Sequence, residues 1–369
     1  MSENLKQLSE AGVSIWLDDL SRERLDTGTL KALIDNSYVV GVTTNPSIFS
    51  AAISGSDRYT ADVLELHKDG ANVHQIVEKL TTDDVRNACD LFMPVYERTN
   101  GVDGRVSIEV EPNLAYDTTA TIDRAVALHA LVNRPNVLIK VPATIDGLPA
   151  IEEITARGIS VNVTLIFSVE RYEAVMDAYL RGLERRHANG EDLSAVHSVA
   201  SFFVSRIDTE IDKRLDAASP NNPLRGKAAI ANAHLAYEAY LAVINSQRWQ
   251  RLAAAGARLQ RPLWASTGVK DPAYDKAQYV IELVAKDCVN TMPEGTLNVV
   301  RDNGVVRGDT ISNNFEAART TFTALKEAGI DFDQITSLLE DEGVNKFIAA
   351  WDELLANIVA KTNAEEKSE

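Results

Sequence analysis

The sequence Val-Leu-Ile-Lys-Val-Pro at residues 137–142 places a single lysine inside an apolar run. Apolar runs of this length are typical of strands that are buried on both faces, as in a parallel sheet. A buried lysine is rare, because removing its charge from water costs several kcal/mol unless the charge is paired or neutralised. The run therefore predicts a strand of a parallel sheet that carries an unusual residue, Lys140.

Two interpretations of Lys140 are open at this point. The ordinary pKa of a lysine is about 10.4, and lowering it to about 7 requires roughly 4 kcal/mol of burial or neighbouring charge. A lysine tuned in this way attacks carbonyl carbon and forms a Schiff base. The alternative is a lysine at a strand end that reaches solvent or pairs with a carboxylate. The six residues alone favour the alternative, so the choice depends on the rest of the chain.

Short apolar runs of the same kind recur along the 369 residues and alternate with longer amphipathic segments such as Thr82–Glu97 and Val169–Arg186. Eight strands separated by helices indicate a single (β/α)8 TIM barrel of the α/β class rather than an open sheet. The expected strands are Val13–Asp18, Val39–Thr44, Arg105–Glu111, Val137–Pro142, Ser160–Phe167, His197–Ser205, Pro262–Thr267 and Cys288–Pro293.

Two helical regions exceed a minimal barrel. The first is an insertion at about residues 221–251, which is rich in alanine, and the second is a set of extra C-terminal helices at about residues 309–361. The second region is in a position to cap the barrel mouth. No linker rich in Gly and Ser or in Pro and Gly divides the chain, so we expect residues 1–369 to form one domain.

Composition excludes several classes of function. Hydrophobic residues make up 45% and charged residues 25%, as in soluble globular proteins, and the net charge is −17. An acidic surface repels nucleic acid and anionic membrane, so neither is an expected partner. No apolar stretch approaches the ~20 residues that span a bilayer, and the polar N-terminus is unlike a signal peptide. We therefore expect a cytoplasmic protein, which is either a monomer or a homodimer.

The chain offers little for a metal or a bound cofactor. Cys89 and Cys288 lie far apart, and the six histidines show no HxH or HExxH spacing. Reduced thiols in a cytosolic enzyme are the simpler interpretation of the two cysteines. No G-x-G-x-x-G follows a predicted strand, and no P-loop motif occurs. We expect no metal and no cofactor.

Polar residues gather near the carboxyl ends of the predicted strands. Alternate residues of a barrel strand point inward, and those near the carboxyl end face the active site. Many strands that carry polar residues at the same end indicate one shared polar pocket. The polar residues concerned are Asp18, Asn45, Ser107, Glu109, Glu111, Lys140, Ser160, Asn162, Thr164, Ser201, Ser205 and Ser266, and Phe203 shares the face of Ser201 and Ser205.

This set suits Schiff-base aldol chemistry, which needs an amine nucleophile, a base for a hydroxyl proton and a group that handles water. A metal is not required, because the protonated imine is itself the electron sink. Taken singly, Asp18 and Glu109 are equally compatible with helix caps or surface ion pairs, and Asn45 before Pro46 with a turn or an N-cap.

Two cations are candidates for phosphate binding. Arg206 follows the sixth predicted strand and Lys270 follows the seventh. A cation beside hydroxyls and loop amides at neighbouring strand ends is how barrels often hold a phosphate. The alternatives are an ion pair of Arg206 with Asp208 or Asp212 and a solvated loop position for Lys270.

Taken together, these segments resemble a transaldolase, in family order from about Ser14 to Pro293. The resemblance implies a class I aldolase-type barrel that transfers a dihydroxyacetone unit between sugar phosphates. In the family, sedoheptulose 7-phosphate and glyceraldehyde 3-phosphate are interconverted with erythrose 4-phosphate and fructose 6-phosphate in the pentose phosphate pathway. The matching motifs are Thr-Thr-Asn-Pro-Ser at 43–47, Ser-Ile-Glu-Val at 107–110 with Tyr-Asp-Thr at 116–118, Ile-Lys-Val-Pro-Ala-Thr at 139–144 and Asn-Val-Thr-Leu-Ile-Phe-Ser at 162–168.

The resemblance also implies a role for each matching residue. Lys140 would form the imine, and Asp18 would take the substrate hydroxyl proton during cleavage and return it during addition. Glu109 with Thr164 would position the water of imine formation and hydrolysis. The remaining roles concern binding: Asn45 and Asn162 for sugar hydroxyls and the amine, Ser201 for the dihydroxyacetone unit, Phe203 near the carbanion, and Arg206 and Ser266 for phosphate.

One position departs from the family pattern. Many transaldolases carry Ser-x-Arg at the seventh strand, whereas this chain has Ser-Thr-Gly at residues 266–268. Lys270 is a possible replacement for the missing arginine, which fits a longer bacterial subgroup. The closest alternative function is a fructose 6-phosphate aldolase on the same barrel, and a more distant one is a sugar-phosphate-binding barrel without catalysis.

Overall fold

Eight parallel strands form a closed barrel in the computed structural model, which describes residues 2–366. Strand β1 pairs with both β2 and β8, so the sheet has no free edge. The strands are β1 (Ser14–Leu17), β2 (Val39–Val42), β3 (Arg105–Glu109), β4 (Val137–Pro142), β5 (Val161–Ile166), β6 (Ser198–Phe203), β7 (Gln260–Ala265) and β8 (Val289–Met292). The predicted (β/α)8 barrel is confirmed, and each predicted strand overlaps one strand of the barrel.

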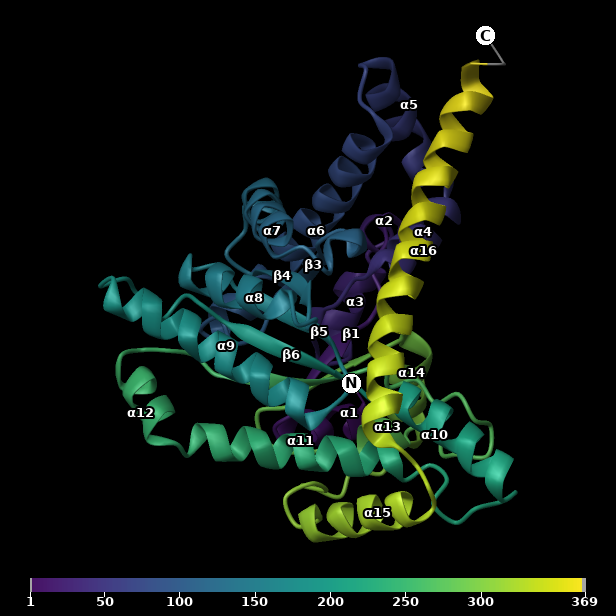
Figure 1. Cartoon of the computed structure of the whole chain (residues 1–369). Coiled ribbons are helices and arrows are strands. Elements are labelled where there is room, and N and C mark those ends of the chain that lie inside the picture. Colours follow the sequence, from purple (N-terminus) through teal and green to yellow (C-terminus); the bar gives the residue numbers. More distant parts are fainter. Residues whose placement is uncertain (1, 367–369) are drawn as a thin grey trace.

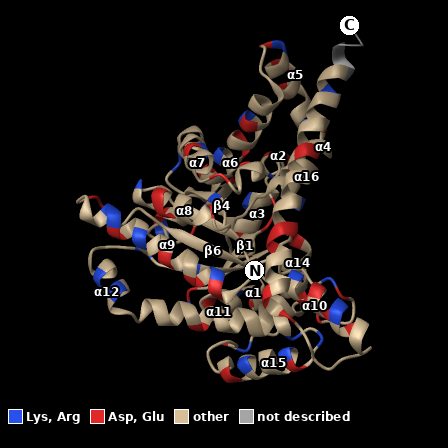
Figure 2. Ribbon diagram, viewed as in Figure 1, with Lys and Arg blue, Asp and Glu red and all other residues tan. Residues whose placement is uncertain are grey.

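Helices cover the outside of the barrel and follow the strands along the chain (Figure 1). They are α1 (Glu3–Glu10), α2 (Arg22–Asp26), α3 (Thr29–Asn36), α4 (Pro46–Ser54), η1 (Asp57–Tyr59), α5 (Thr60–Lys68), α6 (Val73–Arg98), η2 (Pro112–Leu114), α7 (Thr118–Val132), α8 (Gly147–Ala156), α9 (Val169–Ala188), α10 (Ser205–Ala218), α11 (Ala228–Ile244), α12 (Gln247–Ala254), α13 (Gln278–Ile281), α14 (Glu294–Asn303), α15 (Phe315–Glu327) and α16 (Phe332–Glu366). Figure 2 shows acidic and basic residues interspersed along these helices.

The register of the central strands aligns three of the candidate site residues. Glu109 of β3 pairs with Lys140 of β4, and Lys140 pairs with Asn162 of β5. Residues that are paired across neighbouring strands of a barrel lie at the same level and point to the same side. The register therefore brings a carboxylate, an amine and an amide together inside the barrel.

Glu111 does not join this row, although strict alternation along Arg105–Glu111 would place it there. Strand β3 ends at Glu109, and the 3-10 helix η2 begins at Pro112. Oε2 of Glu111 instead accepts a hydrogen bond from Nε of Arg124 on α7 at 2.7 Å. The expectation for Glu111 is wrong, because the period of two holds only while the backbone remains extended.

The amino-terminal end of the barrel is closed by large side chains. Trp16 of β1 is fully buried, and a Cβ atom at Gly41 of β2 would lie 2.5 Å from its indole ring. The indole nitrogen donates to Asp103 at 3.2 Å, and Asp103 also accepts from Arg261 at 2.9 Å. A glycine at position 41 is thus required for the indole to fill the barrel. This packed floor leaves the carboxyl ends of the strands as the open end of the barrel.

The two additional regions are helical. Helices α11 and α12 lie in the first, and α15, which packs against α11, lies in the second. Helix α16 is 35 residues long and packs against η2, β5 and α10 before it extends along α4 and α5 (Figure 1). It therefore crosses the end of the barrel at which β3, β5 and β6 terminate.

Two further observations concern the whole of the described chain. Cys89 and Cys288 are both buried and free. Within residues 2–366, no helix is both long enough and apolar enough to cross a membrane.

Candidate active site

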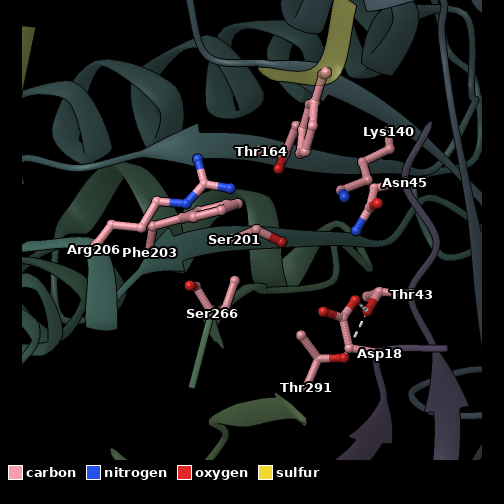
Figure 3. A pocket seen from close by; sticks show the side chains of 12 residues that line it. Asp18, Thr43, Asn45, Lys140, Thr164, Ser201, Phe203, Arg206, Ser266 and Thr291 are labelled. Carbon is pink, nitrogen blue, oxygen red and sulfur yellow. Dashed lines mark hydrogen bonds between the residues drawn. The ribbon is translucent and has the colours of Figure 1, made fainter. Parts of the chain in front are cut away.

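A polar pocket opens at the carboxyl ends of the barrel strands. Most of the predicted site residues line it, and they come from strands distant in sequence (Figure 3). Its lining consists of Asp18, Thr43, Asn45, Lys140, Thr164, Ser201, Phe203, Arg206, Ala265, Ser266, Thr291 and Phe347. The inference of one shared pocket from separate strand ends therefore matches the geometry.

Lys140 lines this pocket and is only 4% exposed. Its Nζ donates a hydrogen bond to the carbonyl oxygen of Thr44 at 3.0 Å and lies 3.2 Å from Oε2 of Glu109. The side chain of Glu109 is itself only 3% exposed. Lys140 does not reach bulk solvent. It is both buried and paired with a carboxylate, so features of both interpretations of the sequence occur together.

The two carboxylates near the amine share one electrostatic pattern. Burial raises the pKa of Glu109, and the charge of Lys140 opposes that rise. Burial likewise raises the pKa of Asp18, and the charge of Lys140 and a hydrogen bond from Thr43 oppose it. A carboxylate of raised pKa binds a proton more readily than an ordinary one, which favours its use as a general base and acid.

A chain of hydroxyls holds Asp18 in place. Oγ1 of Thr43 donates to Oδ1 of Asp18 at 2.6 Å and lies 2.6 Å from Oγ1 of Thr291. Because the Thr43 proton is used on Asp18, Thr291 is the donor in the second bond. Figure 3 shows Asp18 and these hydroxyls on one side of the pocket. The carboxylate is therefore oriented before any ligand binds.

A second chain orients the opposite wall. Nδ2 of Asn162 donates to Oγ of Ser107 at 2.9 Å, and Oγ of Ser201 donates to Oδ1 of Asn162 at 2.7 Å. Asn162 is fully buried behind the pocket, whereas Ser201 lines it. Asn162 therefore acts on the pocket wall through Ser201.

Asn45 has a structural function as well as a place in the lining. Its Oδ1 accepts a hydrogen bond from the backbone N–H of Ile48 at 3.0 Å, which makes it the N-cap of α4, with Pro46 as the first helical residue. The N-cap interpretation of the sequence is correct. Its amide nonetheless borders the pocket, on the same side as Lys140 (Figure 3).

Four polar atoms at the site are buried and have no hydrogen-bond partner in the part of the chain that the structure describes. They are Oε1 and Oε2 of Glu109, Oγ1 of Thr164 and Nη1 of Arg206. Buried polar atoms in proteins are almost always satisfied, by water or ligand where no protein partner is present. Their coincidence at one pocket indicates a site built for a polar ligand.

Arg206 points into the pocket rather than towards the acids on its own helix. Its guanidinium carbon lies 5.1 Å from the ring centre of Phe203, and burial lowers the pKa of Arg206. Asp208 accepts from the Tyr279 hydroxyl and Asp212 from the Tyr274 hydroxyl, each at 2.6 Å. Those two acids are therefore satisfied elsewhere, and a buried cation remains available to an anion.

The comparisons with known proteins agree with this geometry. The family described as "Transaldolase/Fructose-6-phosphate aldolase" matches residues 15–358. A protein named "Transaldolase" from Renibacterium salmoninarum is 57% identical over 366 residues, covering 99% of this chain and 98% of the relative. "Transaldolase 1" from Streptomyces avermitilis is 59% identical over 355 residues, covering 96% and 94%, respectively. "Transaldolase" from Mycolicibacterium smegmatis is 57% identical over 366 residues, covering 99% of each.

The chain belongs to the transaldolase/fructose-6-phosphate aldolase family.

Within this member of the transaldolase/fructose-6-phosphate aldolase family, Lys270 is the candidate cation outside the pocket lining, although its Nζ lies 4.0 Å from where a Cβ atom at Gly268 would be. It is exposed and is not among the residues that line the pocket. Ser266, by contrast, lines the pocket with a positive φ of 56°, and its hydroxyl lies 3.0 Å from that of Ser205. The replacement of the missing arginine by Lys270 stays a prediction.

Four lining residues of this family member were not singled out as site residues by the sequence, and one of them is the small Ala265. Thr43 lies in a segment rich in side-chain hydroxyls, and this richness could have identified it as a site residue. Thr291 lies on β8, where no such pattern in the sequence marks it. Phe347 lies on α16, far along the chain, and its ring centre is 5.7 Å from Nζ of Lys140. Nothing in its local sequence pattern distinguishes Phe347 from an ordinary core residue of an amphipathic helix.

Proposed function

We propose that this protein is a transaldolase that transfers a dihydroxyacetone unit from sedoheptulose 7-phosphate to glyceraldehyde 3-phosphate, giving erythrose 4-phosphate and fructose 6-phosphate. The relatives that match along nearly the whole chain, at 54–59% identity, carry the name "Transaldolase". The observation that carries the proposal is the amine of Lys140, buried beside Glu109 in a pocket with further polar groups.

Imine formation begins at Lys140. The amine passes one proton to Glu109 and attacks the ketone carbon of the donor, and the carbinolamine hydroxyl then takes a proton back and leaves as water, which gives the protonated imine. Glu109 and Thr164 both have a buried oxygen without a protein partner, close to where that water must leave and later return. We assign the handling of this water to these two residues.

Carbon–carbon cleavage follows at Asp18. The carboxylate takes the proton of the donor hydroxyl next to the bond that breaks, the aldose leaves, and the electron pair moves into the imine to form an enamine. Addition to the acceptor aldehyde reverses these steps, and Asp18 returns the proton to the new hydroxyl. The raised pKa of Asp18 and its fixed orientation by Thr43 suit both directions.

The remaining lining residues bind the substrate. We assign the hydroxyls of the dihydroxyacetone unit to Asn45 and Ser201, with Asn162 positioning Ser201. Phe203 borders the carbanion end, and the phosphate is assigned to Arg206 and Ser266, with Lys270 as the candidate for a second cation. The unpartnered Nη1 of Arg206 is the strongest support for a bound anion.

The alternative is a fructose 6-phosphate aldolase, which uses the same lysine and releases dihydroxyacetone instead of transferring it. Both activities occur in the description of the family. The names of the relatives favour transfer. We further expect a cytoplasmic enzyme that is a monomer or a homodimer. Size-exclusion chromatography with light scattering measures the oligomeric state.

The test is borohydride reduction in the presence of fructose 6-phosphate, followed by peptide mass mapping. We expect a reduced adduct on the peptide that contains Lys140 and none in Lys140→Ala. Lys31→Ala, an exposed lysine on α3, is the matched control and should retain the adduct. Product analysis with and without erythrose 4-phosphate then separates transfer from aldol cleavage. An adduct on another lysine, or none at all, would overturn the assignment.

A further inference from the structure

Helix α16 presents two residues to the active site from one side. Gly343 and Phe347 are four positions apart, so they lie on the same face of the helix. A Cβ atom at Gly343 would lie 2.9 Å from Cδ2 of Leu165 and 3.5 Å from Nη1 of Arg206. The glycine therefore allows the helix backbone to approach the barrel residues closely, and this approach brings Phe347 into the pocket.

Contacts on both sides of Gly343 fix this part of α16. Oε2 of Glu340 lies 3.0 Å from Nη1 of Arg171 on α9, and Leu339 and Val344 are buried. Phe347 itself is only 4% exposed. Its position over the pocket is thus set by packing and by an ion pair rather than by a mobile loop.

The aromatic ring stands above the amine that forms the covalent intermediate. Its centre is 5.7 Å from Nζ of Lys140, whereas the other aromatic of the pocket, Phe203, lies under the guanidinium of Arg206. Polar groups of Thr44 and Glu109 approach the same amine from within the barrel. Phe347 is therefore the apolar group that separates Lys140 from the side of α16.

We propose that Phe347 shields the enamine on Lys140 from water and so determines whether the dihydroxyacetone unit is transferred or released. This proposal rests on the proposed transaldolase function. An enamine that waits for its acceptor must not meet a proton donor, and bulk water is the most abundant one. Excluding water from a closed site is a recognised way to suppress such side reactions.

The two outcomes differ in a single bond. In transfer, the enamine carbon forms a bond to the acceptor aldehyde carbon, and the aldehyde oxygen takes the proton from Asp18. In release, the same carbon takes a proton that is ultimately supplied by water. In both cases one water then adds to the imine carbon, the carbon–nitrogen bond breaks and the amine of Lys140 is restored. Shielding thus acts on the step before hydrolysis.

The experiment compares Phe347→Ala, Phe347→Leu and Trp351→Ala with the unmodified protein. Trp351 lies one turn further along α16 and lines a different surface pocket, so it is a matched aromatic control. The readout is the ratio of free dihydroxyacetone to transferred product, at a fixed concentration of erythrose 4-phosphate as acceptor. We expect a rise of about tenfold in Phe347→Ala, corresponding to about 1.4 kcal/mol between the two barriers. Phe347→Leu and Trp351→Ala should stay near the ratio of the unmodified protein.

Separate results identify which proposal fails. If the unmodified protein gives no adduct on Lys140 and no transfer, the proposed function fails, whatever the variants do. If it transfers, and Phe347→Ala lowers turnover without changing the ratio, the shielding role is overturned and Phe347 is only structural. An equal rise in Phe347→Leu would also overturn it, because leucine retains apolar bulk over the amine.

Discussion

Replacing Lys140 with alanine should abolish catalysis and make the stability of the protein depend on pH in a new way. In the native structure Lys140 lies 3.2 Å from Glu109, and both side chains are almost inaccessible to water. Breaking a buried ion pair by removing one partner costs about 3–5 kcal/mol, because the other charge is left without compensation. Glu109 can avoid that cost only by taking up a proton.

The direction of the pH effect follows from the pKa of Glu109. Burial already raises this pKa while Lys140 opposes the rise, so loss of Lys140 must raise it further. The unfolded chain releases the proton above its ordinary pKa of about 4.3. The folded state of the variant still holds it, so its stability is complete below that pH and is lost as the pH rises towards the folded pKa.

The magnitude follows from the linkage of one proton, which is about 1.4 kcal/mol per pH unit. Between pH 5 and pH 8 we expect the free energy of unfolding of Lys140→Ala to fall by about 2–4 kcal/mol relative to the unmodified protein. Urea unfolding at both pH values, at one ionic strength, measures it.

The double variant Lys140→Ala, Glu109→Gln is the control, because glutamine retains the shape but not the charge. The double variant should lose most of the pH dependence of the free energy of unfolding. Asp18, which lines the same pocket, should account for the smaller part that remains. If Lys140→Ala has the same free energy of unfolding as the unmodified protein at both pH values, the buried ion pair is refuted. A double variant that keeps the full dependence would refute the assignment to Glu109.

Four further outcomes are expected. Asp18→Asn should retain the borohydride adduct but slow carbon–carbon cleavage by about 10²–10⁴, and an equal loss of both steps would contradict its role. Arg206→Gln should raise KM for fructose 6-phosphate with kcat nearly unchanged. Lys270→Ala, which alters an exposed side chain, should raise KM less. An unchanged KM in Lys270→Ala would show that Lys270 is a solvated loop residue that does not bind phosphate. Asn45→Ser should keep the N-cap of α4 yet lower activity, whereas Asn45→Ala should lower activity and also cost about 1 kcal/mol of stability in unfolding experiments. If Asn45→Ser is as active as the unmodified protein, the amide of Asn45 does not contact substrate. EDTA should leave the transfer rate unchanged, and strong inhibition would revive a metal-dependent mechanism.

The sequence predicted the barrel because its signals are local. Each strand is a short apolar run between amphipathic helices, and β4 was predicted with the bounds that it has in the structure. The same period of two placed Glu109, Asn162 and Thr164 on inward faces. It failed at Glu111, where β3 stops and the backbone turns into η2.

The residues of the site were thus largely determined by the sequence, because a closed parallel barrel brings all carboxyl ends of its strands to one mouth. The contacts between these residues were not determined by the sequence. Strand register and side-chain packing decide that Lys140 contacts Glu109 and that Thr43 holds Asp18. They also decide that Nη1 of Arg206 has no hydrogen-bond partner within the described residues. Phe347 depends on tertiary structure alone, since α16 returns to the barrel mouth some 200 residues after Lys140. No local pattern records such a contact, because it is selected by packing between surfaces that the chain brings together only when it folds.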